Sequence, residues 1–307
     1  MTNYLVNRLF GALLTVWVTT LAVCFLIHLV PGDPVQIMYA QSATTTPEQL
    51  DLIRHNLGLD RSIIHQYVIY MSNLLQGDFG TTIRGQQKVL DLILLRLPYT
   101  LWLTITALII SLIIGGVAGF FAAYKQGQWL DRLLMSSTII GISIPPFWLG
   151  LMLLAFFSVN LGWFPVAGDG WLSLILPATT LAACQAATIG RIVRSTMIDI
   201  FDQDYIRTAY AKGLSKPRVL GRHALRSGMV PIISILGMQF AYMMGGAIVV
   251  EYIFSWNGLG RLAIQAIFQR DYPLIQGFIL TFSIIVVLVS VLMDVLYAAL
   301  DPRISRK

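Results

Sequence analysis

Long apolar runs separated by short polar segments form the main pattern of this chain. Six intervals of more than 20 residues contain no Asp, Glu, Lys or Arg; they are 9–32, 97–124, 133–168, 170–190, 227–250 and 272–293. A bilayer core about 30 Å thick needs roughly 20 helical residues at about 1.5 Å each. The pattern therefore predicts an all-α polytopic membrane protein. Its six transmembrane helices are expected near 9–30, 99–124, 134–160, 172–194, 228–250 and 275–298.

The positive charges predict the orientation of these helices. With the N-terminus inside, the inner segments carry 14 Lys and Arg residues and the outer segments carry 7. Cytoplasmic loops usually hold the excess, so both termini are expected in the cytoplasm. The same bias accounts for much of the net charge of +6 without a nucleic-acid partner. A DNA-reading helix-turn-helix in 205–224 is the alternative, but membrane spans tether that segment at both ends.

This orientation divides the chain into segments with different surroundings. Residues 1–30 form an N-terminal tail and the first span, and 31–96 form an extracytoplasmic segment. Residues 97–300 form the membrane core, with a cytoplasmic loop at 201–227, and 301–307 form a cytoplasmic tail. Only 12% of the chain is charged, against a typical value of about 25%, and 56% is hydrophobic. That balance is typical of a protein solvated largely by lipid.

The extracytoplasmic segment carries two helix patterns. In the first, Thr46 is placed as an N-cap, Pro47 as the first helical residue and Gln49 as the capping-box partner. In the second, apolar residues recur at helical spacing over 64–75. We expect two amphipathic helices at the outer mouth, which either cover the bundle or contact a soluble outer partner.

The cytoplasmic loop carries a helix-turn-helix pattern. A short helix is predicted around Ala209–Leu214, with Gly213 as the stop signal, since Gly is favoured just past a helix end. Ser215 is then a suitable N-cap for a second helix, with Pro217 in its first turn. Two short helices joined by a Gly turn would make a compact plug for the cleft of a soluble partner.

The sequence shows no catalytic, metal or nucleotide site. It has no His-Glu-x-x-His pair, and Asp294 is the one acidic residue near a span interior, where a structural role is expected. Residues that interrupt helices are more informative about function than the ionisable residues are. They suit a transport pathway that must open and close. The pathway or gate candidates are Pro145, Pro146, Met243, Met244, Gly245 and Gly246.

Ordered short motifs along nearly the whole chain point to one family. They are Asn7-Arg8, Pro31-Gly32-Asp33-Pro34, Leu57-Gly58-Leu59-Asp60, Gly77-Asp78-Phe79-Gly80, Pro98-Tyr99-Thr100-Leu101, Asp204-Tyr205, Ala211-Lys212-Gly213, Arg222-His223-Ala224-Leu225-Arg226, Pro231, Val250-Glu251, Gly258-Leu259-Gly260-Arg261, Arg270-Asp271-Tyr272-Pro273 and Asp301-Pro302-Arg303. With this set the chain resembles the first permease subunit of bacterial dipeptide, oligopeptide, glutathione and nickel ABC importers. Two positions depart from the family pattern: Arg207-Thr208-Ala209 replaces Glu-Ala-Ala, and Asn257 stands where Pro is frequent.

The resemblance implies a type I ABC importer permease in the bacterial inner membrane. It implies pairing with a second, related permease, two ATP-binding subunits that hold ATP and Mg²⁺, and an extracytoplasmic binding protein. No cofactor is expected in this chain. The implied ATPase-coupling loop comprises Tyr205, Arg207, Thr208, Ala209, Ala211, Lys212, Gly213, Leu214, Ser215, Arg218 and Arg222.

Small peptides are the expected substrate, because they dominate this family. A nickel or nickel-chelate importer is the alternative within the class, with His55 and His65 as its sole hint. A different class, the ion-coupled secondary transporter, would need a midplane carboxylate or cation site and an inverted repeat. An intramembrane hydrolase would need a Ser or His constellation inside a span. The sequence shows none of these features.

Overall fold

The structure is a computed structural model that describes residues 2–29, 35, 46–56, 60–83 and 85–300. The chain forms two compact units. One comprises Tyr99–Asn257 and Val289–Lys307, and the other Thr2–Pro98 and Gly258–Leu288. Two long helices pass along the chain from one unit to the next, so each unit contains part of both.

Five helices in the described residues are long and apolar enough to cross a membrane. They are α1 (Thr2–Leu29), α5 (Val89–Tyr124), α8 (Trp171–Phe201), α11 (Leu225–Ile253) and α13 (Tyr272–Leu300). A sixth candidate is the pair formed by α6 (Trp129–Ser143) and α7 (Pro146–Leu153) with its π-helical extension η1 (Leu154–Asn160). The predicted number of spans therefore agrees with the structure if the pair is one span.

The third span predicted near 134–160 is broken at its Pro145-Pro146 pair. Its two halves meet at 97°. Ile144 has extended backbone (φ −83°, ψ 121°), because the residue before a proline is disfavoured in the helical region. Pro146 then starts α7, at a position where a missing N–H costs little. The Pro145-Pro146 pair thus breaks the helix and redirects it.

The unit around Tyr99–Asn257 has two apolar cores. One joins α5, α8 and α11 through residues such as Leu103, Leu181 and Met243. The second lies around Val193 and Met197 of α8. α5 and α8 approach so closely that a Cβ atom on Gly115 would overlap the carbonyl oxygen of Ala186, and a Cβ atom on Gly119 would overlap the carbonyl oxygen of Gly190. Small residues permit such contact between membrane helices.

A buried ion pair adds a polar contact between α6 and α8. Arg194 donates through Nε to Asp131 Oδ1 (2.6 Å) and through Nη2 to Asp131 Oδ2 (2.8 Å). The backbone N–H of Gly127, a residue with φ +77°, donates to the same carboxylate at 2.9 Å. Only 5% of the Asp131 side chain is exposed. The paired geometry satisfies a carboxylate that would be costly to bury alone.

The unit around Thr2–Pro98 contains the two predicted outer helices, α3 (Pro47–Asn56) and α4 (Ile63–Leu75). The capping box is confirmed: Thr46 N–H donates to Gln49 Oε1 at 3.0 Å and Gln49 N–H to Thr46 Oγ1 at 3.4 Å. The hydroxyls of Tyr67 in α4 and Thr20 in α1 lie 3.0 Å apart. Thus α4 covers the end of α1. Gly58, which the sequence places just past the end of the first of these helices, lies outside the described residues.

Helix α12 (Leu259–Gln269) is an amphipathic helix that the hydrophobic pattern did not predict. Leu259, Ala263 and Ala266 are buried at helical spacing. Leu259 and Ala266 belong to the unit's core, where they pack with Val89 and Ile93 of the first turns of α5. α5 therefore begins well before the predicted start of its span, because its first turns are needed in this core.

The close approach at Gly115 gives a stability prediction. Replacing Gly115 with Ala should lower the free energy of unfolding by about 1–3 kcal/mol, because the new methyl group meets the backbone of α8. The matched control is Gly116→Ala, where no atom lies within 4 Å of the new Cβ. Thermal unfolding of the purified protein in detergent compares the two. Equal stabilities would contradict the contact between α5 and α8.

Candidate functional site

The predicted Gly turn in the cytoplasmic loop is present at the end of α9 (Asp204–Ala211). Gly213 has φ +76°, the left-handed conformation that Gly adopts readily. Its N–H donates to the Tyr210 carbonyl at 2.9 Å, and Leu214 N–H donates to the Ala209 carbonyl at 3.3 Å. These two bonds define a Schellman motif, which ends α9 at a fixed angle.

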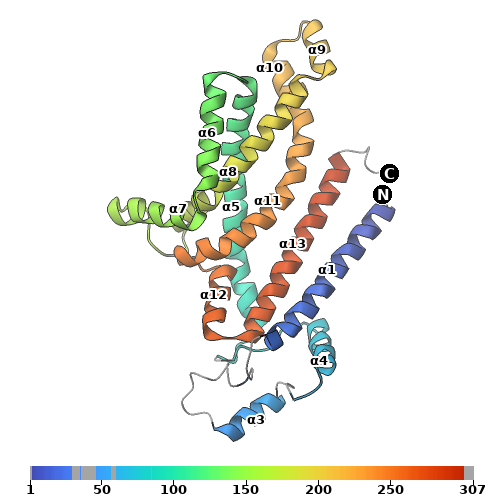
Figure 1. Cartoon of the computed structure of the whole chain (residues 1–307), viewed down its shortest axis with the longest axis vertical. Helices are drawn as coiled ribbons and strands as arrows, with labels where there is room; N and C mark the ends of the chain where they lie inside the picture. The colour runs from blue at the N-terminus through green and yellow to red at the C-terminus, as the bar shows by residue number, and fades with distance from the viewer. Residues whose placement is uncertain (1, 30–34, 36–45, 57–59, 84, 301–307) are drawn as a thin grey trace. The chain divides into compact units, whose positions relative to one another are not determined.

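The second short helix of the predicted plug is not a separate element. Ser215 is the N-cap residue, with extended backbone, but its side chain makes no capping hydrogen bond. α10 (Lys216–Arg218) runs without a break into a π-helical segment, η2 (Val219–Ala224), and then into α11. The loop therefore contains one separate helix, α9, which precedes the N-terminal extension of α11 formed by α10 and η2 (Figure 1).

The loop has an apolar underside that is buried in its own unit. Ile206, Ala209 and Val219 are buried, and Leu214 is half-buried against the same cluster, which includes Met197 of α8. Ala209 and Leu214 thus seat the loop on the bundle, on the side away from its exposed residues. The predicted loop residues that do face outward are Tyr205, Arg207, Thr208, Ala211, Lys212, Gly213, Ser215, Arg218 and Arg222.

The predicted gate residues Met243 and Met244 are fully buried in the unit. Met243 lies in the core shared with α5 and α8, and Met244 Sδ lies 3.6 Å from the Thr104 hydroxyl that donates to it. Gly246 faces Leu181 of α8, whereas a Cβ on Gly245 would meet no atom within 4 Å. The structure therefore places both methionines in packing roles in this conformation.

The uncovered face of α11 lies on the opposite side from those methionines. It carries residues with large exposed surfaces, spaced alternately by four and three positions, which places them on one helical face. They are Met238, Tyr242, Gly245, Val249 and Tyr252. We call these five residues the α11 open face. The sequence analysis named the neighbouring Met243 and Met244 as pathway or gate candidates, whereas the exposed residues lie on a different face of the same helix.

A buried polar contact fixes the far end of α11. Glu251 is fully buried, and the Thr100 hydroxyl donates to its Oε1 at 2.6 Å. Nearby, the Trp256 indole N–H donates to the Tyr99 carbonyl at 3.0 Å. The sequence placed Glu251 in an outer loop, whereas the structure places it in the last turn of α11. Asp294, the acidic residue for which the sequence predicts a structural role, is half-buried in α13.

The two histidines that suggested nickel have separate partners. His55 Nδ1 lies 2.8 Å from Asp60 Oδ2, and His65 Nε2 lies 2.6 Å from Arg61 Nη1. The hydrogen bond from His55 holds the pKa of Asp60 below its usual value. Among the described residues there is no group of three or more His, Cys, Asp or Glu placed to hold a metal ion.

Comparison with known proteins gives two matching family models. The model described as the binding-protein-dependent transport system inner membrane component matches residues 115–306. A second model, for the N-terminal part of such membrane components, matches residues 1–104. The chain is 43% identical, over the full length of both proteins, to the glutathione transport system permease protein GsiC of Escherichia coli K12. The same identity and coverage hold for GsiC of Shigella dysenteriae serotype 1.

Solved structures with a similar fold are also transporters. An inward-facing structure of the MetNI methionine ABC transporter has a TM-score of 0.61 at 19% identity, covering 69% of this chain and 97% of that one. A crystal structure of an amino acid ABC transporter with histidines has a TM-score of 0.56 at 18% identity, covering 68% and 94%. The fold is therefore that of type I ABC importer permeases.

Proposed function

The chain belongs to the family of binding-protein-dependent transport system inner membrane components, and from this premise we propose that it carries small peptides of the glutathione kind. As a member of that family it is a permease subunit of an ABC importer, located in the inner membrane and non-catalytic by itself. The family assignment excludes the ion-coupled secondary transporter. The peptide assignment rests on the 43% full-length identity to glutathione permeases.

The complete importer has the subunits that the family implies. This chain pairs with a second permease to form one pathway, two ATPase subunits bind ATP and Mg²⁺, and a binding protein delivers the peptide from outside. Both termini and the α9 loop lie in the cytoplasm, as the positive-charge bias indicates. The same orientation puts α3 and α4 on the side from which the binding protein approaches.

The α9 loop transmits movement of the ATPase subunits to the membrane helices. The outward members of the predicted coupling loop meet the ATPase, while the buried underside of the loop holds it on α8. These outward members are Tyr205, Arg207, Thr208, Ala211, Lys212, Gly213, Ser215, Arg218 and Arg222. Because α10, η2 and α11 are continuous, a displacement of α9 reaches the membrane through one helix. The outward face carries the cations Arg207, Lys212 and Arg218, so an acidic surface on the ATPase would complement it.

The α11 open face contributes to the translocation pathway. Its residues are exposed on a helix whose other side is packed into the core, as expected for a surface shared with the second permease or with substrate. Tyr242 and Tyr252 offer hydroxyl groups for peptide amides, and Gly245 leaves room between them. The Pro145-Pro146 break supplies a bend that lets α6 and α7 move separately.

Uptake by the reconstituted transporter tests the substrate. The chain, its second permease, the ATPases and the binding protein are placed in vesicles with labelled glutathione, a dipeptide or Ni²⁺. We expect ATP-dependent uptake of peptide and none of Ni²⁺, because peptide is the substrate class of the 43% identical relatives. Uptake of Ni²⁺ alone would overturn the peptide assignment and favour the nickel alternative.

A pair of Gly213 variants tests the coupling loop. Val at φ +76° is strained by about 1–2 kcal/mol, whereas Asn tolerates this conformation. No atom lies within 4 Å of a Cβ at this position, so the effect is one of backbone conformation and not of steric overlap. We expect Gly213→Val to lower coupled uptake severalfold while ATP hydrolysis continues, and Gly213→Asn to remain coupled. Full coupling in the Val variant would exclude a rigid turn from the mechanism.

Cysteine labelling tests the α11 open face. In a background with Cys24 and Cys184 replaced by Ala, Tyr242→Cys should react with a membrane-impermeant maleimide at a rate that changes with ATP, because 74% of this side chain is exposed. The control is Met243→Cys, one position along and fully buried, which should stay unreactive. Absence of labelling at Tyr242→Cys, or a labelling rate that ATP leaves unchanged, would show that the open face does not border an aqueous pathway.

A further inference from the structure

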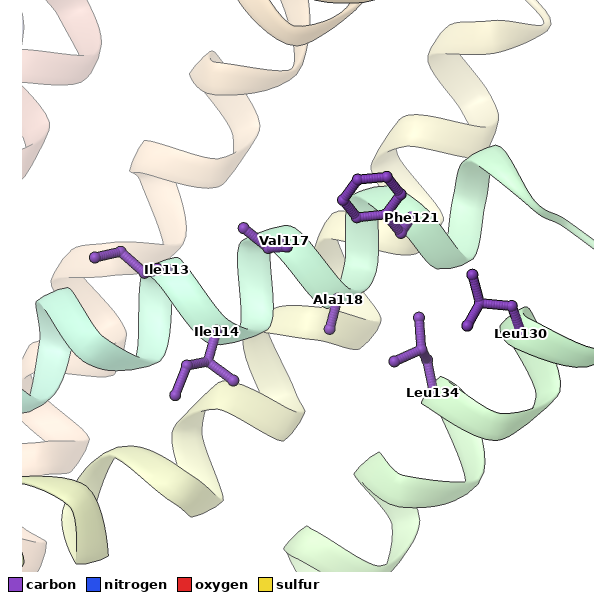
Figure 2. A pocket seen from close by; sticks show the side chains of 7 residues that line it. All are labelled: Ile113, Ile114, Val117, Ala118, Phe121, Leu130 and Leu134. Carbon is purple, nitrogen blue, oxygen red and sulfur yellow. The ribbon is translucent and has the colours of Figure 1, made fainter.

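An apolar groove lies between α5 and α6. It has a volume of about 470 Å³ and is lined by Ile113, Ile114, Val117, Ala118, Phe121, Leu130 and Leu134. Figure 2 shows the α5 residues on successive turns, with Leu130 and Leu134 of α6 pointing toward that helix. The groove is on the opposite side of α5 from Gly115 and Gly119, which contact α8. Its walls are aliphatic and aromatic throughout.

Two cations lie at the end of this groove. Tyr124 and Lys125 follow Phe121 by three and four residues, so they continue the groove-lining face of α5. Lys125 Nζ lies 5.5 Å from the centroid of the Tyr124 ring, and Lys216 Nζ of α10 lies 4.9 Å from the same centroid. A hydrogen bond to the Tyr124 hydroxyl raises the pKa of Lys216, so its ammonium group stays charged.

Both ammonium groups lie within 5.5 Å of the centroid of the same ring, so the two charges can attract one anion together. We propose that an anionic phospholipid occupies this site, with an acyl chain in the α5–α6 groove and its phosphate between Lys125 and Lys216. Each half of the site matches one half of such a lipid. The membrane-facing apolar groove suits the acyl chain of the lipid, and the paired lysines at headgroup depth suit its phosphate.

The occupant is a lipid and not a transmembrane helix of the second permease, because of the lysines. A helix of another protein would fill the groove but leave both cations without an anionic partner. Free phosphate would engage the cations but leave the groove empty. The assignment of the lipid to the cytoplasmic leaflet follows from the proposed orientation of the protein. The site itself follows from the positions of the groove and the two lysines alone.

The position of Lys216 gives the lipid a role. Lys216 is the first residue of α10, at the point where the α9 loop joins the extended end of α11. Lys125 follows the last residue of α5. A phosphate held between them would join the loop to the fixed bundle, so the lipid would restrain the segment that the ATPase subunits move.

Native mass spectrometry of the purified, complete transporter tests the site. With phosphatidylglycerol we expect one retained lipid per copy of this chain, and weaker retention of phosphatidylcholine. Lys125→Gln with Lys216→Gln should weaken retention about fivefold for each lysine, roughly twentyfold to thirtyfold together. The arginine pair Lys125→Arg with Lys216→Arg should restore it, and Lys88→Gln, a cation elsewhere in the chain, should have no effect.

The groove is tested separately by filling it. Val117→Trp should reduce retention with both lysines present, whereas Ile109→Trp should not, since Ile109 is on the same helix, is equally exposed at 53% and lies outside the groove. Retention that survives the double Gln change or Val117→Trp would overturn the proposal. So would full displacement by glycerol 3-phosphate, or a cross-link from Leu134→Cys to a second-permease helix in lipid-free protein. Because no transport is measured, these outcomes are independent of the proposed peptide uptake.

Discussion

Close backbone contact between α5 and α8 is the constraint on which the rest of the membrane core depends. In lipid, apolar side chains gain little by leaving one helix surface for another, so helices associate through close packing and buried hydrogen bonds. Gly115 and Gly119 bring the two backbones together, and the ion pair between Asp131 and Arg194 fixes α6 against the same helix. α8 is thereby held on two sides, and it becomes the fixed element on which α11 and the α9 loop rest.

That arrangement explains how a chain without chemistry of its own can take part in ATP-driven transport. The Schellman turn at Gly213 sets the angle of α9, and the apolar underside of the loop holds it against the end of α8. The connection to α11 is a continuous helix with a π-helical stretch, a geometry often found at functional sites. In the proposed mechanism, force on α9 therefore rotates or shifts α11 instead of bending a flexible link.

The sequence predicted those features that depend on local chemistry. The capping box at Thr46 and Gln49, the stop at Gly213 and the break at Pro145-Pro146 follow from residues adjacent in the chain, and the structure contains all three. Features that depend on distant partners were missed. The contact of Glu251 with Thr100 joins residues far apart in sequence, and the apolar intervals understate α5 because its first turns are held by α12.

The same reasoning explains why the two surfaces proposed to be functional were harder to predict than the helices. Hydropathy cannot separate a residue facing lipid from one facing a core or a pathway, since all three are apolar in a membrane protein. Burial separates Met243 from Tyr242, although they are neighbours. The polar groups beside each surface then distinguish the two exposed surfaces from each other. Tyrosine hydroxyls lie along the α11 open face, whereas the α5–α6 groove is purely apolar and ends in two lysines. The first combination suits a polar substrate and the second a lipid with an anionic headgroup.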